Sequence, residues 1–251
     1  MIPKRVTKFI KSLQIKKYRK QHNTFFVEGA KSVVELLESD YEVTTLIGTP
    51  VFLKENNFLL KNSKFEVFET DEAELSSLGN FKTNNACLAT ARTKPNEIQK
   101  INDGELVLGL DDVRDPGNLG TIIRVADWYG VKKIICSINC AEFYNPKVIS
   151  ATMGSFTRVK LFYTDLLGFV KHCQYPVYGA FLDGENVHNI PLNGPGGFII
   201  MGNESSGINK ELENFVGTKI LIPQFGGAES LNVSIATAII CDNFRRKEAG
   251  G

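Results

Sequence analysis

Apolar and polar residues in the first third of the chain alternate in blocks that predict strands and helices in turn. Short apolar runs predict strands at residues 25–27, 43–47, 65–68 and 86–91. Helical patterns fill the segments between them, at residues 30–38, 50–61 and 71–78. Thr70 is the expected N-cap of the third helix. Such alternation is typical of a small α/β domain.

The alternation breaks at residues 92–104, where Pro95, Asn96 and Gly104 predict a linker. It then resumes with apolar runs that predict strands at residues 105–110, 133–136, 159–162, 177–180, 198–201 and 218–222. Helices are expected at residues 118–129, 146–153, 165–173, 210–215 and 232–247. The 251 residues therefore predict two domains, a small α/β domain at residues 1–91 and a larger α/β domain at residues 105–251.

Three polar loops follow predicted strands of the larger domain. Residues 111–120 follow its first strand, residues 202–207 its fifth and residues 223–234 its sixth. All three contain Gly and Asn beside carboxylates. Because ligands of open α/β sheets bind at the carboxyl ends of strands, we expect the three loops to form one site.

Each of these loops also has a purely structural interpretation. Glu204 could be an acid at the start of the next helix. Ser230 could be the N-cap of the last helix, with Asn232 in its first turn. Arg124 could be an exposed position on an amphipathic helix. The loops match neither a Walker A phosphate loop nor the GxGxxG dinucleotide pattern, and no His lies near them in the sequence.

Charge is balanced over the chain but not along it. There are 29 basic and 28 acidic residues, for a net charge of +1. No acid occurs before Glu28, whereas the first twenty residues contain Lys4, Arg5, Lys8, Lys11, Lys16, Lys17, Arg19 and Lys20. Such a run suits an RNA phosphate backbone, because each contact releases counterions. The alternative is a solvated helix with no ligand.

The cysteines and histidines predict no metal site. The five Cys form no CxxC pair, and the three His give no zinc-ligand spacing. The start of the chain lacks the apolar core of a signal peptide, and no apolar run reaches the roughly 18 residues of a membrane span. We therefore expect a cytoplasmic protein that uses neither a metal nor a membrane.

The polar loops together resemble the three motifs of one family. Residues 118–126, NLGTIIRVA, resemble the first motif of the SpoU (TrmH-like) RNA 2′-O-ribose methyltransferases of the SPOUT superfamily. Residues 202–207, GNESSG, resemble the second motif. Residues 222–246, which contain IP and SLNVS, resemble the third. The order and separations fit, and the resemblance covers roughly residues 105–247.

This resemblance implies a particular fold and assembly. Members have a C-terminal α/β domain whose chain forms a trefoil knot, and dimerisation completes their active site. The knot loops bind S-adenosylmethionine. The domain at residues 1–91 is similar to the RNA-binding domain that many members carry, which resembles kink-turn-binding ribosomal proteins. The resemblance thus predicts a homodimer that binds RNA.

The resemblance also implies the reaction and the residues that carry it out. The reaction is methyl transfer from S-adenosylmethionine to a ribose 2′-OH of RNA. The matching catalytic positions are Asn118, Arg124, Glu204, Ser230 and Asn232. The matching cofactor positions are Leu182, Gly202, Ile222 and Leu231. Since Arg is always protonated, Arg124 is expected to hold a phosphate or stabilise the developing alkoxide rather than act as a base.

Two other functions fit parts of the sequence. A methyltransferase of the same superfamily could act on a base nitrogen, although the residue set favours ribose. An RNA-binding protein could keep the fold without activity, although both Arg124 and Glu204 are present. The accessory domain favours ribosomal RNA over transfer RNA by analogy with the family alone. The sequence identifies neither the RNA nor the nucleotide.

Overall fold

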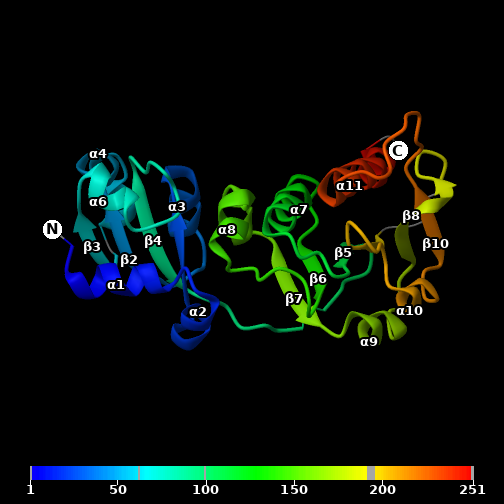
Figure 1. Cartoon of the computed structure of the whole chain (residues 1–251), viewed down its shortest axis with the longest axis horizontal. Coiled ribbons are helices and arrows are strands. Elements are labelled where there is room, and N and C mark those ends of the chain that lie inside the picture. Colours follow the sequence, from blue (N-terminus) through cyan, green and yellow to red (C-terminus); the bar gives the residue numbers. More distant parts are fainter. Residues whose placement is uncertain (1, 62, 99, 191–195, 250–251) are drawn as a thin grey trace. The chain divides into compact units, whose positions relative to one another are not determined.

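The computed structural model describes residues 2–61, 63–98, 100–190 and 196–249, and the chain forms two compact units (Figure 1). The first unit comprises Met1–Pro95 and Tyr144–Thr157, and the second comprises Asn96–Phe143 and Arg158–Gly251. The ranges expected for the two domains include residues 1, 62, 191–195 and 250–251, which lie outside the described residues.

The first unit is built on a four-stranded sheet. Its strands are β1 (Thr24–Glu28), β2 (Val43–Gly48), β3 (Glu66–Glu69) and β4 (Cys87–Arg92), in the order β1-β4-β2-β3. β4 pairs antiparallel with β1 and β2, and β3 pairs parallel with β2. The helices are α1 (Lys4–Ser12), α2 (Lys16–His22), α3 (Ala30–Leu37), α4 (Pro50–Glu55), α5 (Asn57–Leu60) and α6 (Glu72–Ser76). The four predicted strands are all confirmed.

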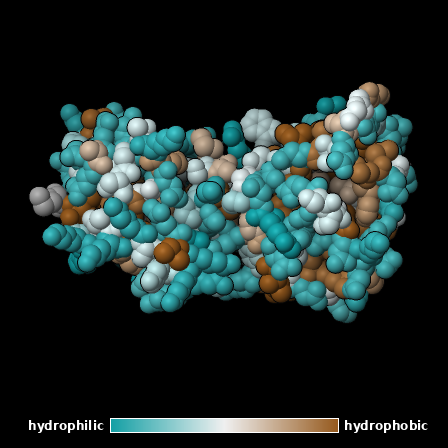
Figure 2. Space-filling model, in the orientation of Figure 1, coloured by the Kyte–Doolittle hydropathy of each residue, from teal (hydrophilic) through white to brown (hydrophobic). Residues whose placement is uncertain are grey.

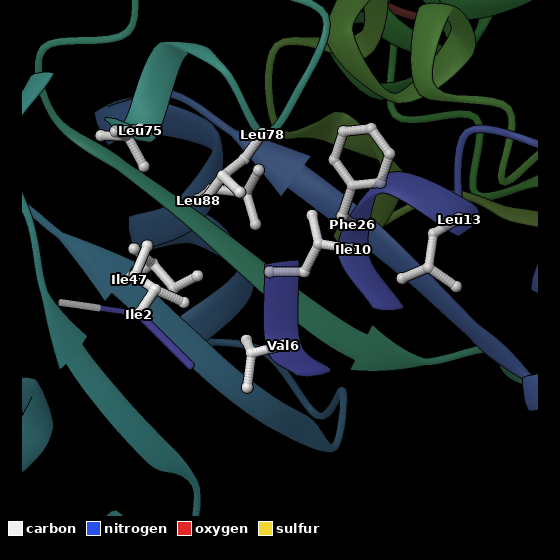
Figure 3. Packing of buried hydrophobic residues seen from close by; sticks show 9 residues of the cluster. All are labelled: Ile2, Val6, Ile10, Leu13, Phe26, Ile47, Leu75, Leu78 and Leu88. Atoms are coloured by element: carbon white, nitrogen blue, oxygen red, sulfur yellow. The ribbon is translucent and has the colours of Figure 1, made fainter. Parts of the chain in front are cut away.

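The basic helix α1 is amphipathic and packs on this sheet. Val6 and Ile10 of α1 are buried in one cluster with Phe26 and Leu88 of the strands (Figure 3). The Lys and Arg side chains of α1 lie on its exposed side. Burial of the apolar stripe therefore fixes the helix and directs its positive charge to solvent.

Arg19 differs from the other basic residues of the amino-terminal run. It is buried, with 3% of its surface exposed. Its Nη1 donates to the carbonyl oxygens of Leu13 and Gln14, each at 2.8 Å, at the end of α1. These carbonyls lack partners within the helix, so a guanidinium satisfies them. The expectation that Arg19 contacts RNA with its neighbours is therefore wrong, because its side chain caps a helix inside the unit.

Two helix boundaries differ from the sequence prediction. The helix predicted at residues 50–61 divides into α4 and α5 at Asn56, whose side chain donates to the carbonyl of Phe52 at 2.9 Å. Asp71, rather than Thr70, is the N-cap of α6, and its Oδ1 accepts the N–H of Glu74 at 2.8 Å. The short polar side chains of Asn56 and Asp71 hydrogen-bond nearby backbone groups and so end or begin a helix. Helix propensity alone does not predict at which residue this happens.

Residues 144–157 belong to the first unit although they were expected within residues 105–251. They form α8 (Pro146–Thr152) and a 3-10 turn, η1 (Ser155–Thr157). The rings of Tyr144 and Phe156 lie 4.6 Å and 5.9 Å from the ring of Phe25 on β1. A short helix between two strands carries no local signal of which sheet it covers. Aromatic packing decides its place.

The second unit is built on a six-stranded, fully parallel sheet. Its strands are β5 (Leu106–Leu110), β6 (Lys133–Ser137), β7 (Lys160–Thr164), β8 (Val177–Asn186), β9 (Gly197–Met201) and β10 (Thr218–Leu221), in the order β10-β8-β9-β5-β6-β7. β5 and β9 are buried throughout and lie side by side. The chain order reverses between these two strands, so their carboxyl ends form a topological switch point, where ligands of such sheets bind.

Helices cover both faces of the parallel sheet (Figure 1). α7 (Pro116–Trp128) and α11 (Val233–Ala249) pack together on one side, where Arg245 Nε of α11 donates to the carbonyl of Tyr129 at 2.6 Å. α9 (Leu166–Lys171) and α10 (Lys210–Glu213) cover the other side through Leu166 and Leu212. No helix of the described residues is long and apolar enough to span a membrane.

β8 extends further than the strand predicted at residues 177–180. It continues to Asn186, because its second half pairs with β10 after a shift of register between Lys219 and Ile220. Leu182, expected in a loop, therefore lies within a strand, and 74% of its surface is exposed. Pairing with a distant edge strand is a tertiary property that the local sequence does not contain.

Candidate active site

The first turn of α7 brings Asn118 to the carboxyl edge of the parallel sheet. The helix begins at Pro116, earlier than the predicted start at residue 118, because Asp115 is its N-cap. Asp115 Oδ1 accepts the N–H of Asn118 at 2.8 Å, and Pro116 has no N–H that needs a partner. The loop after β5 is thus joined to the helix by a well-defined cap.

Three of the five expected catalytic residues form one hydrogen-bonded chain. Asn118 Nδ2 donates to Glu204 Oε1 at 2.6 Å. Asn232 Nδ2 donates to Asn118 Oδ1 at 2.8 Å. The three side chains come from α7, from the loop after β9 and from the residue before α11. The structure therefore joins all three predicted loops, as the single-site hypothesis requires.

The donor-to-acceptor direction of these hydrogen bonds is set by Ser234, at the start of α11. The backbone N–H of Ser234 donates to Asn232 Oδ1 at 2.9 Å, and Ser234 Oγ donates to the same atom at 2.5 Å. A backbone N–H is an unambiguous donor, so the amide oxygen of Asn232 faces Ser234. Its nitrogen then faces Asn118, whose nitrogen in turn faces Glu204. The carboxylate of Glu204 therefore receives an oriented donor.

The structural alternatives for Glu204 and Ser230 are not observed. Asn209 is the N-cap of α10, and its Oδ1 accepts the N–H of Glu211 at 2.8 Å. Glu204 caps no helix. Asn232, rather than Ser230, lies directly before α11 and accepts the N–H of Ser234 in its first turn. Capping explains part of the position of Asn232, but it leaves Asn232 Nδ2 free to hold Asn118.

Arg124 and Ser230 are not joined to this chain. Arg124 lies in α7, two turns after Asn118, and is exposed. Ser230 is exposed in the segment before α11. Within the described residues, neither side chain makes a hydrogen bond or an ion pair. An exposed, unpaired guanidinium can bind an anion bidentately.

Two of the residues expected to hold the cofactor follow strand ends, one lies within β8 and one lies just before α11. Gly202 follows β9 and packs against the backbone of its own loop, where a Cβ would lie 2.3 Å from the carbonyl carbon of Gly207. Ile222 follows β10 and is half-buried, and Leu231 is 48% exposed. These apolar side chains could cover an adenine ring, which fits the expected S-adenosylmethionine. Leu182 is exposed on β8.

The sequence analysis did not assign a role to Asn203 or Ser137, which both hydrogen-bond the backbone of Asp112 in the loop after β5. Asn203 Nδ2 donates to the carbonyl of Asp112 at 2.8 Å, and Ser137 Oγ accepts the N–H of Asp112 at 2.8 Å. Asn203 was visible within the GNESSG motif, but Ser137 had no local signal. Burial raises the pKa of the neighbouring Asp111, whose carboxylate accepts the N–H of Asn209. The described residues contain no cluster of His, Cys, Asp and Glu that could hold a metal ion.

Two known protein families match parts of this chain. Residues 105–242 match the SpoU rRNA Methylase family, and residues 4–89 match the MRM3-like substrate binding domain. The chain is 30% identical over 241 residues to the 23S rRNA (guanosine(2553)-2′-O)-methyltransferase RlmP of Bacillus subtilis (strain 168), with 94% of each chain covered.

Solved structures with the same fold include proteins from two other bacteria. One is a protein assigned to the TrmH family of RNA methyltransferases from Porphyromonas gingivalis, with 35% identity, a TM-score of 0.84 and coverage of 98% of this chain and 99% of that one. Another is the AdoMet-bound rRNA methyltransferase from Sinorhizobium meliloti, with 29% identity, a TM-score of 0.88 and coverage of 98% and 96%. The chain therefore belongs to the SpoU rRNA methylase family and is an RNA methyltransferase.

Proposed function

We propose that this enzyme transfers a methyl group from S-adenosylmethionine to a ribose 2′-OH of ribosomal RNA. The observation that carries the proposal is the oriented chain Asn232–Asn118–Glu204 at the switch point of the parallel sheet. The relatives support the chemistry, since RlmP is named as a 23S rRNA 2′-O-methyltransferase and the Sinorhizobium meliloti structure is described as AdoMet-bound.

The residues of this chain would orient the ribose and stabilise its oxygen. S-adenosylmethionine, when bound, supplies a methyl group on a sulfonium. Arg124 has a permanent charge and no partner among the described residues, so its guanidinium can hold an adjacent phosphate or the developing alkoxide. Glu204 keeps one oxygen on Asn118, which fixes the carboxylate for contact with the ribose. Ser230 and Asn232 would hydrogen-bond the reacting ribose.

The substrate can be identified by mapping 2′-O-methylation in total RNA with and without the gene. We expect one site in ribosomal RNA to lose its methyl group when the gene is removed. Because a 2′-O-methyl blocks alkaline cleavage at the next phosphate, the same digestion separates ribose from base methylation. Loss of a mark in transfer RNA would select the alternative substrate, and loss of a base methyl would contradict ribose chemistry.

The cofactor would be held by Gly202, Ile222 and Leu231, with Leu182 at the side of the pocket. The exposed apolar surface of Leu231 and the close backbone packing at Gly202 support this assignment. We also propose that the reaction needs no metal. Enzyme treated with a chelator should retain full activity, and a strict requirement for added Mg²⁺ would contradict the proposal.

The first unit would bind RNA backbone through its exposed basic helices. The match of residues 4–89 to the MRM3-like substrate binding domain supports this role. So does the position of Lys8, Lys11, Lys16 and Lys20, all exposed on α1 and α2. The proposed likeness to kink-turn-binding ribosomal proteins can be tested by adding a kink-turn RNA as a competitor in binding measurements.

The second unit would form a homodimer and contain a trefoil knot. Ile235 of α11 is 51% exposed and Leu231 is 48% exposed, and Figure 2 shows hydrophobic side chains at the surface in the region of α11. Exposed apolar surface of this kind favours a partner copy. The return of the chain from edge strand β10 to pack α11 on α7 supports the knot. Light scattering at micromolar concentration should show a dimer, and a crystal structure would establish the threading.

The proposed cellular location is the cytoplasm. Its support is the sequence alone, in which five cysteines form no recognisable disulfide framework. Fractionation of cells that express the tagged protein would test the location.

A further inference from the structure

The two ends of the Asn118–Glu204 hydrogen bond belong to different segments of the chain. Glu204 lies in the loop after β9, whereas Asn118 lies in α7 after β5. A distance of 2.6 Å between their side chains therefore depends on how the two loops are held together. An error of about 1 Å in such alignment lowers turnover by about a hundredfold.

Asn203, the residue before Glu204, connects these two loops with its side chain. Its Oδ1 accepts the backbone N–H groups of Ser205 at 2.8 Å and Ser206 at 3.2 Å, which closes the loop after β9. Its Nδ2 donates to the carbonyl of Asp112 at 2.8 Å, in the loop after β5. One amide thus shapes its own loop through its oxygen and reaches the other loop through its nitrogen.

The acceptor of that bond, Asp112, has an unusual backbone conformation. Its φ is +59°, in the left-handed region that non-glycine residues seldom adopt. Its N–H donates to Ser137 Oγ at 2.8 Å, at the end of β6, and its carbonyl accepts Asn203 Nδ2. The two peptide groups that flank the Asp112 Cα are therefore each held by a side chain. Such conformations persist only where the surroundings determine them, and they occur often at functional sites.

We propose that Asn203 is a positioning residue for methyl transfer. Through Asp112 it holds the loop after β5 at the distance that lets Asn118 reach Glu204. Its side chain makes no hydrogen bond to either member of that pair among the described residues. The inference rests on the proposed function, because it gives Asn203 a role in the reaction of the same site.

The competing explanation is that Asn203 only shapes its own turn. Two substitutions separate these roles. Asn203→Asp keeps an oxygen for the N–H groups of Ser205 and Ser206, but it puts an oxygen opposite the Asp112 carbonyl in place of the donor. Asn203→Ala removes both functions. If the local turn alone matters, Asp should replace Asn well, whereas a role in joining the loops predicts that Asp fails nearly as badly as Ala.

The test measures methyl transfer from S-adenosylmethionine to total RNA from cells that lack the gene. We expect N203D to lower kcat by about tenfold to a hundredfold. The affinity for S-adenosylmethionine, measured by calorimetry, should stay within about threefold, because the Asn203–Gly207 backbone pairing beside Gly202 is retained. Ser137→Ala, which removes the acceptor of the Asp112 N–H, should cause a smaller loss of the same kind.

Three results would overturn the inference. One is an N203D enzyme with wild-type kcat. Another is a loss of cofactor affinity and melting temperature in proportion to the loss of kcat, which would indicate a general structural defect. If N203D fails to fold, the Ser137→Ala enzyme decides, and wild-type kcat in that variant would count against the proposal. An inactive wild-type enzyme would instead overturn the proposed function, and with it the inference.

Discussion

The two units of this chain carry their polar chemistry in different ways. In the second unit, Asn232, Asn118 and Glu204 are joined in series, and each side chain determines the orientation of the next. In the first unit, the exposed lysines of α1 and α2 act as separate charges, and a buried apolar stripe fixes α1.

The difference matches the roles that we propose for the two units. Chemistry at a single ribose oxygen requires groups aligned within a fraction of an ångström. A phosphate backbone requires positive charge over an area, with little demand on the position of any one side chain. Substitutions in the second unit should therefore change turnover, and those on the surface of the first unit should change RNA affinity and its salt dependence.

Arg124→Ala should give the largest effect. Removal of the guanidinium should lower kcat by about a thousandfold, as when a donor to a developing oxyanion is removed. The affinity for S-adenosylmethionine should remain nearly intact, because Arg124 is assigned to the RNA side of the site. Single-turnover assays and calorimetry make the comparison. A parallel loss of cofactor binding would mean that the assignment is wrong.

The series of hydrogen bonds predicts non-additive effects. Asn118→Ala and Asn232→Ala should each lower kcat, by about a hundredfold for Asn118. The double variant should lose less than the product of the two single losses, since Asn232 acts in part by orienting Asn118. A double-mutant cycle should give a coupling energy of about 1 kcal/mol or more. Strict additivity would show that the two amides act independently.

Lys8, Lys11, Lys16 and Lys20 test the surface of the first unit. All four are exposed and have no ion-pair partner among the described residues. Replacing them by Gln should weaken RNA binding and reduce its slope against log salt by about 0.7 to 0.9 for each phosphate that the variant no longer neutralises. The methylated nucleotide should stay the same. An unchanged slope would assign these residues to a solvated surface.

Arg19 is the matched control for those lysines. Because its guanidinium caps α1 from inside the unit, Arg19→Ala should lower the free energy of unfolding by about 2 kcal/mol. The salt dependence of RNA binding should not change in the folded fraction. Chemical denaturation and the same salt titration measure the two effects. A reduced salt slope together with wild-type stability would mean that Arg19 contacts RNA and does not stabilise the fold.

Glu28 gives the smallest predicted effect, a pH dependence of stability. Burial raises its pKa above the ordinary 4.5, against hydrogen bonds from the N–H groups of Asn80 and Phe81. The folded state therefore binds this proton more tightly, so the contribution to stability is present below about pH 4.5 and is lost as the pH rises through the raised pKa. Glu28→Gln removes the titration, so wild type should lose stability relative to the variant as the pH rises from about 4.5 through the raised pKa.

Denaturation of both proteins across that pH range provides the measurement. A difference in unfolding free energy that is constant with pH would show that the carboxylate titrates alike in the folded and unfolded chains. This would leave the packing of the first unit, rather than the charge of Glu28, as the source of its stability.

The sequence by itself determined most of the strands and the three loops of the site. Short apolar runs predict β5 and β9, and the three motifs contain Asn118, Glu204 and Asn232, which the structure joins by hydrogen bonds. These features are local, because a strand or a loop follows from neighbouring residues. The family could also be inferred at this level, since three motifs in order are far more specific than any single one.

The tertiary structure alone decided that residues 144–157 belong to the first unit, that β8 extends to Asn186 and that Arg19 is buried as a helix cap. The first two outcomes depend on partners far away in the sequence, namely Phe25 and β10. Arg19 binds carbonyls only five and six residues earlier, but its burial depends on the fold of the whole unit. The same holds for Asn203 and Ser137, which both hydrogen-bond the backbone of Asp112 although 66 positions separate them. A local pattern contains the chemistry of a side chain, whereas folding selects the neighbour that the side chain contacts.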